Sequence, residues 1–113
     1  MARIANVDMG DAVSSLTPFE NSNGSVFGRD VDDMYVAYSY GKHFPMYVYD
    51  YASRSWFGNN TEQYSPTTTR HQRLARPDVA DISWVDTDYL TDMVHSGSYA
   101  AHCARRCITP DAA

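Results

Sequence analysis

Large and small residues alternate with a period of two in the middle of the chain. The alternation covers Met34–Tyr40 and Met46–Tyr51, and a third run begins at Ser55–Phe57. Short polar turns, Gly41–His43 and Ala52–Arg54, separate these runs. Period-two runs joined by short turns are typical of antiparallel strands that follow one another in a meander. The pattern therefore predicts a three-stranded antiparallel meander.

The alternation also predicts which side chains share a face of the first strand, because successive side chains point to opposite sides. The two predicted sets are Val36, Tyr38 and Tyr40 on one face, and Tyr35, Ala37 and Ser39 on the other. Tyrosines lie in both sets. Since a tyrosine combines an apolar ring with a polar hydroxyl, we expect at least one face to stay partly exposed or to meet a partner.

The segments before the meander have weaker patterns. Residues 1–18 show little periodicity and end at Pro18, which predicts a loosely attached N-terminal arm. Residues 19–28 are rich in turn residues, and Asn23-Gly24 within them is a strong signal for a hairpin or tight turn.

After the meander, helical signals dominate. Pro66 and the hydroxyl residues behind it predict a short helix with Thr67 or Thr68 as its N-cap, ended by Pro77. A further apolar segment spans Ile82–Val85. Asp86-Thr87 is a second N-cap candidate, and an amphipathic stripe follows at Tyr89, Leu90, Met93 and Val94.

The last predicted helix begins after a helix stop at Gly97, which suits a C-cap. Ser98 can cap this helix and Pro110 can end it; its expected inner face consists of Tyr99, Ala100, Cys103 and Cys107. We therefore predict an α+β fold: a single domain, residues 1–113, with a three-stranded antiparallel meander followed by two or three short helices. Residues 1–18 form the arm, 19–77 the core and 78–113 a helical C-terminal extension.

Composition and charge limit the classes of partner that we expect this protein to bind. The chain has 14 acidic and 9 basic residues, a net charge of −5 at neutral pH, which disfavours duplex DNA as a partner. Nine tyrosines favour strands. No apolar run approaches the length of a membrane span, and the N-terminus carries no apolar signal segment, so we expect a cytoplasmic protein without a membrane partner.

The densest polar chemistry lies at the predicted start of the first helix. It consists of Tyr64, Ser65, Thr67, Thr68, Thr69, Arg70, His71, Gln72, Arg73 and Arg76. A helix N-terminus presents free N–H groups to an anion, hydroxyls can add donors, and Arg70 or Arg73 can supply charge. This favours a phosphate, nucleotide or carboxylate site. The structural alternative is that the threonines cap the helix, while His71 and Gln72 hold a neighbouring loop.

Two further candidates have stronger structural alternatives. His43, in the turn that begins at Tyr40, is flanked by glycine and by an aromatic–proline pair, which suits binding or catalysis, yet such a histidine more often bonds to backbone. Cys103 and Cys107 share a helical face near His102, but without a second ligand pair burial of the cysteines is favoured over zinc. We assign no catalytic residue, no metal ligand and no cofactor.

The combined pattern resembles one known family. Tyr38-Ser39-Tyr40-Gly41-x-His43-Phe44-Pro45 and Tyr64-Ser65-x-Thr67-Thr68-x-Arg70-His71-Gln72 are similar to an uncharacterised family of small proteins from tailed bacteriophages and prophages, the domain of unknown function DUF8033. The resemblance covers residues 19–77. It implies a phage-encoded protein in the host cytoplasm, and it favours a binding role for His43 and the segment 67–72.

Three functions follow as hypotheses. The first is a non-enzymatic protein that binds a host or defence-system protein, for example an anti-CRISPR-type inhibitor; small size, acidity and tyrosine-rich strands favour it. The second is a protein that sequesters a nucleotide or cyclic oligonucleotide at the helix start. The third is a phosphoester-processing enzyme with His43 and His71 as acid and base. We expect the first, and the absence of catalytic motifs favours a non-enzyme.

Overall fold

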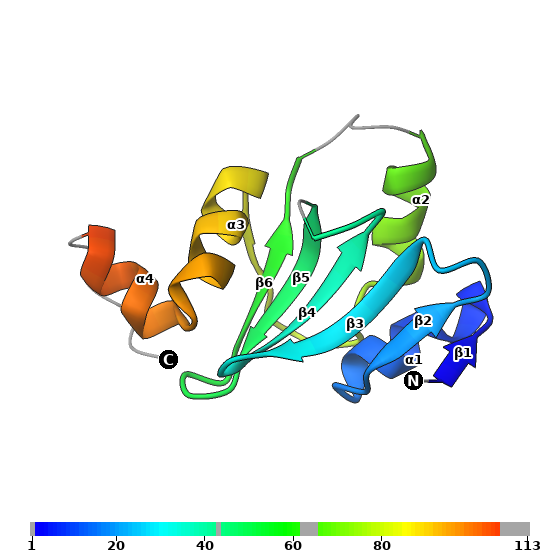
Figure 1. Cartoon of the computed structure of the whole chain (residues 1–113), viewed down its shortest axis with the longest axis horizontal. Helices are drawn as coiled ribbons and strands as arrows, with labels where there is room; N and C mark the ends of the chain where they lie inside the picture. The colour runs from blue at the N-terminus through cyan, green and yellow to red at the C-terminus, as the bar shows by residue number, and fades with distance from the viewer. Residues whose placement is uncertain (1, 43, 62–65, 107–113) are drawn as a thin grey trace.

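A computed structural model describes residues 2–42, 44–61 and 66–106 of the 113-residue chain. One sheet of seven strands runs through it in the order β1-β2-β3-β4-β5-β6-β7 (Figure 1). The strands are β1 (Ala2–Ile4), β2 (Phe19–Asn21), β3 (Val26–Val31), β4 (Met34–Ser39), β5 (Pro45–Asp50), β6 (Ser55–Asn59) and β7 (Ser83–Val85). The helices are the short 3-10 helix η1 (Asn6–Asp8) and the α-helices α1 (Met9–Ser14), α2 (Pro66–Leu74), α3 (Thr87–Ser96) and α4 (Tyr99–Arg106).

The sheet is mixed. Strands β2 to β6 pair antiparallel with their neighbours, whereas the edge strands β1 and β7 pair parallel to β2 and β6. The α+β class is confirmed, but the prediction of a three-stranded meander is wrong. The three predicted strands are β4, β5 and β6, and the sequence pattern did not reveal the other four. Strands β1, β2 and β7 have three residues each, too few for a period of two to be recognised.

Strand β3 was missed because Gly28 and Arg29 interrupt its apolar alternation. Gly28 is required there by packing. A Cβ at this position would lie 2.8 Å from the ring of Phe19 and against the hydroxyl of Tyr35, both of which are fully buried. The close approach of neighbouring side chains therefore explains a glycine inside a strand.

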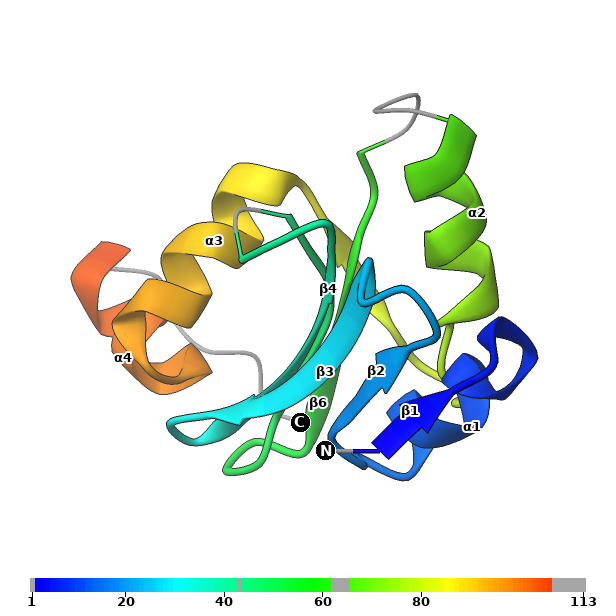
Figure 2. The same cartoon turned by 45° about the vertical axis from the view of Figure 1, so that its right-hand side comes forward.

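Helices cover both faces of the sheet (Figures 1 and 2). Helix α1 and the end of α2 pack on one face, where Met9, Val13, Tyr35 and Ala37 are among the buried residues. Helices α3 and α4 pack on the other face, whose buried residues include Met34, Val36, Tyr38, Leu90 and Met93. The sheet thus separates two apolar cores, each closed by its own pair of helices.

The predicted faces of β4 are confirmed for Tyr35 and Ala37 in one core, and for Val36 and Tyr38 in the other. Tyr40 does not follow the alternation. It lies beyond the strand with φ of 61°, and its ring lies 5.3 Å from that of His71 in α2. Helices on both sides bury every residue of β4, and the exposed tyrosine of the predicted set is Tyr40, which is 56% exposed just beyond the end of the strand.

Residues 2–18 of the predicted N-terminal arm are built into the fold instead of being loosely attached. Strand β1 pairs with β2, and the intervening α1 buries Met9 and Val13 completely. The hairpin predicted at Asn23-Gly24 is confirmed: it joins β2 to β3, Gly24 has φ of 75°, and its N–H donates to the carbonyl of Asn21.

The helix signals of the C-terminal third are largely confirmed. Asp86 caps α3 by accepting from the N–H of Tyr89 at 2.8 Å, and Gly97 ends the helix with φ of 91°. The Ser98 hydroxyl accepts from the N–H of Ala101 at the start of α4. Helix α2 differs, because it begins at Pro66, which places Thr67 and Thr68 inside the helix and not at the N-cap.

The inner face of α4 is partly as predicted. Tyr99 and Cys103 are buried, whereas Ala100 is exposed and His102 is buried in its place. Cys107 and Pro110 lie outside the described residues. Within the described parts of the chain, no helix has the length and apolar character needed to cross a membrane.

Candidate functional site

Helix α2 divides the polar cluster predicted from the sequence. Thr68 and His71 are buried against the sheet, whereas Thr67 and Arg70 are exposed. Gln72 lies between these extremes. The predicted site residues His43, Tyr64 and Ser65 lie outside the described residues. The cluster is therefore not one contact surface: its buried members serve the fold.

His71 fastens α2 to β4. Its Nδ1 lies 2.9 Å from the hydroxyl of Ser39, in a buried hydrogen bond, and the exposed ring of Tyr40 covers it from outside. Burial, together with the positive charge of Arg70, lowers the pKa of His71 below its ordinary value. A neutral imidazole in this position is a structural contact between helix and sheet.

Gln72 fastens the same helix to β5 and β6. Its carbonyl accepts from the hydroxyl of Tyr47 at 2.6 Å, and its side-chain amide donates to the carbonyl of Asn59 at 3.1 Å. Burial raises the pKa of Tyr47 to about 12, against the opposing charge of Arg76. These bonds set the distance between α2 and the edge of the sheet.

An open groove of about 620 Å³ lies beside these contacts, between α2 and strand β7, and is called here the α2–β7 groove. It is lined by Tyr47, Asn59, Asn60, Thr61, Thr69, Gln72, Arg73, Arg76 and Trp84. Thr69, Gln72, Arg73 and Arg76 belong to the predicted cluster. The other walls come from β5, β6, β7 and the residues beside them, which are distant in sequence.

One wall of the groove is aromatic. Trp84 is 44% exposed, its ring meets the edge of Tyr47 at 6.2 Å, and the guanidinium of Arg76 lies over it at 5.3 Å. Gly58 permits this position, since a Cβ there would lie 2.6 Å from the Trp84 ring. The groove thus offers a flat, half-exposed ring next to a cation.

The floor of the groove is rigid because Asn59 is saturated with hydrogen bonds. Its amide donates to the carbonyl of Pro45 at 2.9 Å and to the hydroxyl of Thr87 at 3.0 Å. Its carbonyl oxygen accepts from the N–H of Thr61 at 2.8 Å. This buried side chain joins β5, β6 and the start of α3, so the groove is formed without a ligand.

The charge of the groove is positive. In the described part of the chain, neither Arg73 nor Arg76 forms an ion pair, and no carboxylate or histidine is among the described lining residues. The lining supplies guanidinium, amide and hydroxyl donors, which bind anions. In a protein with a net charge of −5, this local excess of cations distinguishes the groove from the rest of the surface.

Sequence reasoning missed Tyr47, Asn60 and Trp84. Tyr47 was assigned to a strand and Trp84 to an apolar segment, and neither position carries a local signal for a ligand. Arg73, in the last turn of α2, and Arg76, two residues beyond the end of the helix, were the usable signal, because both cations belong to the predicted cluster.

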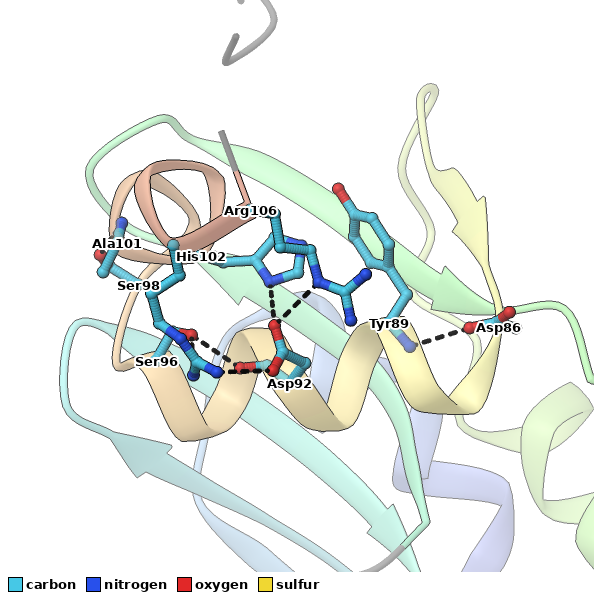
Figure 3. Close-up of polar contacts among 9 residues, drawn as sticks. Asp86, Tyr89, Asp92, Ser96, Ser98, Ala101, His102 and Arg106 are labelled. Carbon is cyan, nitrogen blue, oxygen red and sulfur yellow. Dashed lines mark hydrogen bonds and ion pairs between the residues drawn. The ribbon is translucent and has the colours of Figure 1, made fainter. Parts of the chain in front are cut away.

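A second polar cluster joins α3 to α4 and consists of Asp92, His102, Arg105 and Arg106 (Figure 3). Asp92 Oδ2 lies 2.8 Å from His102 Nδ1 and 3.2 Å from Arg106 Nε, and its Oδ1 lies 3.2 Å from Arg105 Nη2. Burial favours a higher pKa for Asp92, but the hydrogen bonds from Arg106 and His102 and the two arginine charges outweigh it and lower the pKa.

The Asp92 cluster is closed to ligands. His102 is fully buried, its Nε2 has no hydrogen-bond partner among the described residues, and the ring of Tyr89 stands edge-on beside it at 4.5 Å (Figure 3). Cys103, the neighbouring residue, is a buried free cysteine, as predicted. No group of three or more histidine, cysteine or acidic residues in the described segments could hold a metal ion.

Comparisons with known proteins identify no relative: no protein-family model, no curated protein and no solved structure matches this chain. The resemblance of residues 19–77 to DUF8033 therefore stays a prediction.

Proposed function

We propose that this protein binds a phosphate-bearing small molecule of the nucleotide class in the α2–β7 groove. The observation that carries the proposal is the pair of unpaired guanidinium groups, Arg73 and Arg76, in a groove whose described lining holds no carboxylate. Guanidinium groups bind phosphate oxygens in pairs of parallel hydrogen bonds, which a lysine cannot do.

The shape and the aromatic wall support the same class of ligand. A volume of about 620 Å³ suits a small ligand, since such sites span roughly 300–1,000 Å³. The half-exposed ring of Trp84 can stack on a nucleobase, and stacking accepts any base. Asn60, Thr61 and Thr69 add polar groups at the same opening.

The groove favours binding over turnover. General acid–base catalysis most often uses a carboxylate or a histidine, and the described lining supplies neither; its tyrosine, Tyr47, has a pKa raised to about 12, and the Tyr47 hydroxyl donates to the carbonyl of Gln72. The function is therefore sequestration of the ligand, the second of the hypotheses drawn from the sequence. The host-protein partner and the phage-infected host cytoplasm, which the family resemblance implies, stay predictions.

The test is isothermal titration calorimetry of the protein with a panel of mono-, di- and triphosphate nucleotides. The fluorescence of Trp84 provides a second measurement of the same binding. We expect saturable binding, and about tenfold weaker affinity in Arg73→Gln and in Arg76→Gln, because each removes a charged hydrogen-bonding fork. Arg70→Gln is the matched control. It removes the same charge from the same helix outside the groove, and its affinity should stay within about twofold of wild type, since exposed charges act weakly.

Three results contradict the proposal. They are the absence of saturable binding with any nucleotide, equal losses in Arg70→Gln and Arg73→Gln, and unchanged affinity in both groove variants. Equal losses of affinity in Arg70→Gln and Arg73→Gln would mean that the ligand binds at the exposed start of α2, where the sequence predicted the site.

A further inference from the structure

A second hollow lies on the opposite face of the sheet, between β3 and α3, and is called here the β3–α3 hollow. Its volume is about 460 Å³, and residues of both charge signs line it, together with apolar walls. The residues that matter are Arg29, Asp32, Tyr38, Lys42, Val94 and His95. None of them lines the α2–β7 groove.

Arg29 occupies an unusual position in the sheet. Alternation along β3 places it between Phe27 and Val31, which both pack against the core under α3 and α4. Its guanidinium lies over the ring of Phe27, 4.9 Å from the centroid. This cation–π contact holds the planar group against the sheet at the wall of the hollow.

The guanidinium is incompletely satisfied. Its Nε is buried and has no hydrogen-bond partner among the described residues, and Arg29 forms no ion pair there. The neighbouring Asp30 also lines the hollow, but its carboxylate accepts from the hydroxyl of Tyr51 at 2.6 Å and forms no ion pair with Arg29 in the described structure. A buried donor without an acceptor is rare in folded proteins and indicates a missing acceptor.

The residues around Arg29 favour one kind of acceptor for its guanidinium. Lys42 and His95 stand at the hollow with Arg29, but Asp32 also lines it, and its carboxylate lies 3.6 Å from the position a Cβ on Gly97 would take. A phosphate dianion would be repelled by Asp32, whereas a carboxylate carries one charge and matches the planar fork of a guanidinium. Val31, Tyr38 and Val94 provide apolar walls.

We infer that the β3–α3 hollow binds a carboxylate-bearing ligand with a small apolar body, and that Arg29 and Lys42 hold its carboxylate. Free carboxylic acids and the C-terminus of a peptide share this chemistry. The inference is independent of the nucleotide proposal, since the two cavities share no residue and lie on opposite faces of the sheet.

The test is an NMR titration of the full-length, ¹⁵N-labelled protein with N-acetyl-leucine, observed at the Nε–Hε signal of Arg29. That signal is assigned by its loss in Arg29→Lys. We expect a saturable downfield shift, because the carboxylate supplies the missing acceptor. N-acetyl-leucinamide has the same apolar body without the carboxylate and should cause no shift. Titrations with isovalerate and with a leucine-terminated tripeptide then show whether a free acid or the C-terminus of a peptide binds more tightly.

Variants complete the test. Arg29→Gln should weaken N-acetyl-leucine binding about tenfold, observed at the backbone signals of Val94 and His95. Arg54→Gln, in the exposed turn between β5 and β6, is the matched control and should bind as wild type does. Lys42→Gln changes an exposed residue, so it tests the site without risk to the fold and should weaken binding about threefold.

The inference is overturned if N-acetyl-leucine causes no saturable shift, if the amide binds equally well, or if inorganic phosphate binds more tightly than the carboxylate. Unchanged affinity in both Arg29→Gln and Lys42→Gln would also overturn it.

Discussion

The two faces of the sheet differ in whether the arginines at the Asp92 cluster and at the α2–β7 groove form ion pairs. On the α3–α4 face, the carboxylate of Asp92 contacts His102, Arg105 and Arg106 at once. On the α2 face, Arg73 and Arg76 line an open groove without any ion pair in the described structure. Arginine side chains therefore join α3 to α4 on one face, whereas Arg73 and Arg76 on the other face, like Arg29 in the β3–α3 hollow, are available to an anion.

The difference shows that net charge is a poor guide to the ligand of this protein. A total of −5 argues against polyanions in general, yet the described residues that line the groove include two arginines and no acidic residue. Whether a charged side chain can bind a ligand depends on whether another side chain of the protein already pairs with it. A paired cation contributes to the fold, and an unpaired one at an opening is available to a ligand.

The largest expected effect on stability comes from removing the carboxylate of Asp50 on the α3–α4 face. This buried carboxylate accepts from the N–H of Tyr99 at 3.0 Å, and from the N–H and hydroxyl of Ser53 at 2.9 and 2.7 Å. Asp50→Ala should lower the free energy of unfolding by about 3–5 kcal/mol, because one buried and two partly buried donors lose their acceptor. Chemical denaturation measures this. The exposed Asp81→Ala is the control, with an expected change within about 0.5 kcal/mol.

The next effect comes from the α2 face, at Gly58. A Cβ at this position would lie 2.6 Å from the Trp84 ring and 2.9 Å from Ile82. Gly58→Ala should cost about 1–3 kcal/mol of stability and move Trp84, so that nucleotide binding weakens as well. Arg73→Gln provides the contrast, since it should reduce binding while leaving the unfolding midpoint in denaturant near the wild-type value. A Gly58→Ala protein with wild-type Trp84 fluorescence would contradict this account of the groove wall.

The centre of the fold could be predicted because its strands carry their own signals. Strands β4, β5 and β6 alternate over five or six residues, and the caps of α3 and α4 depend on single residues such as Asp86, Gly97 and Ser98. The strands outside this centre are defined by their partners. Strand β7 has three residues, two of them exposed, and is a strand only because β6 pairs with it.

The site was predicted less well than the fold, for a related reason. The segment 67–72 was predicted to bind a ligand, with a structural role as the alternative, and the sequence could not show which of its side chains face the sheet. Helix geometry turns Thr68 and His71 inward and leaves Thr69 and Arg73 at the groove. Trp84 joins them through strand pairing, which no local pattern reports.

The pH dependence of the α2 face should come from His71. Burial and Arg70 lower its pKa in the folded state, so the unfolded chain, with an ordinary value near 6.5, binds the proton first as the pH falls. The stability due to neutral His71 is therefore complete above about pH 6.5 and is lost as the pH falls toward the folded-state pKa.

His71→Gln tests this. At pH 7.5 the variant should be less stable by about 1–2 kcal/mol, because the bond to Ser39 is weakened. The difference from wild type should then shrink as the pH falls below 6.5. Melting curves of both proteins from pH 8 to pH 5 give the comparison, and a difference that stays constant over this range would show that His71 has an ordinary pKa.

The smallest effect, and the sharpest contrast between the faces, is expected at Asp92. Burial favours a higher pKa for this carboxyl, but the hydrogen bonds from Arg106 and His102 and the charge of Arg105 outweigh it, so the folded-state pKa lies below the ordinary value near 3.9. The stability that Asp92 contributes is therefore present above about pH 4 and is lost as the pH falls through the folded-state value. The effect is small because Arg105 and Arg106 are half exposed and water screens their charges.

Asp92→Asn should accordingly melt below wild type at pH 7, and the two melting temperatures should converge as the pH falls below about 4 and through the folded-state pKa of Asp92. Molar salt should narrow the gap at pH 7, because salt screens partly exposed ion pairs. Arg106→Gln completes a double-mutant cycle: if the pair acts as the geometry indicates, this second change costs less in the Asp92→Asn background than in wild type. Additive losses would mean that the two side chains stabilise α4 independently. The α3–α4 face should respond to pH only below about 4, and the α2 face as the pH falls below about 6.5, which separates the two faces in one pH series.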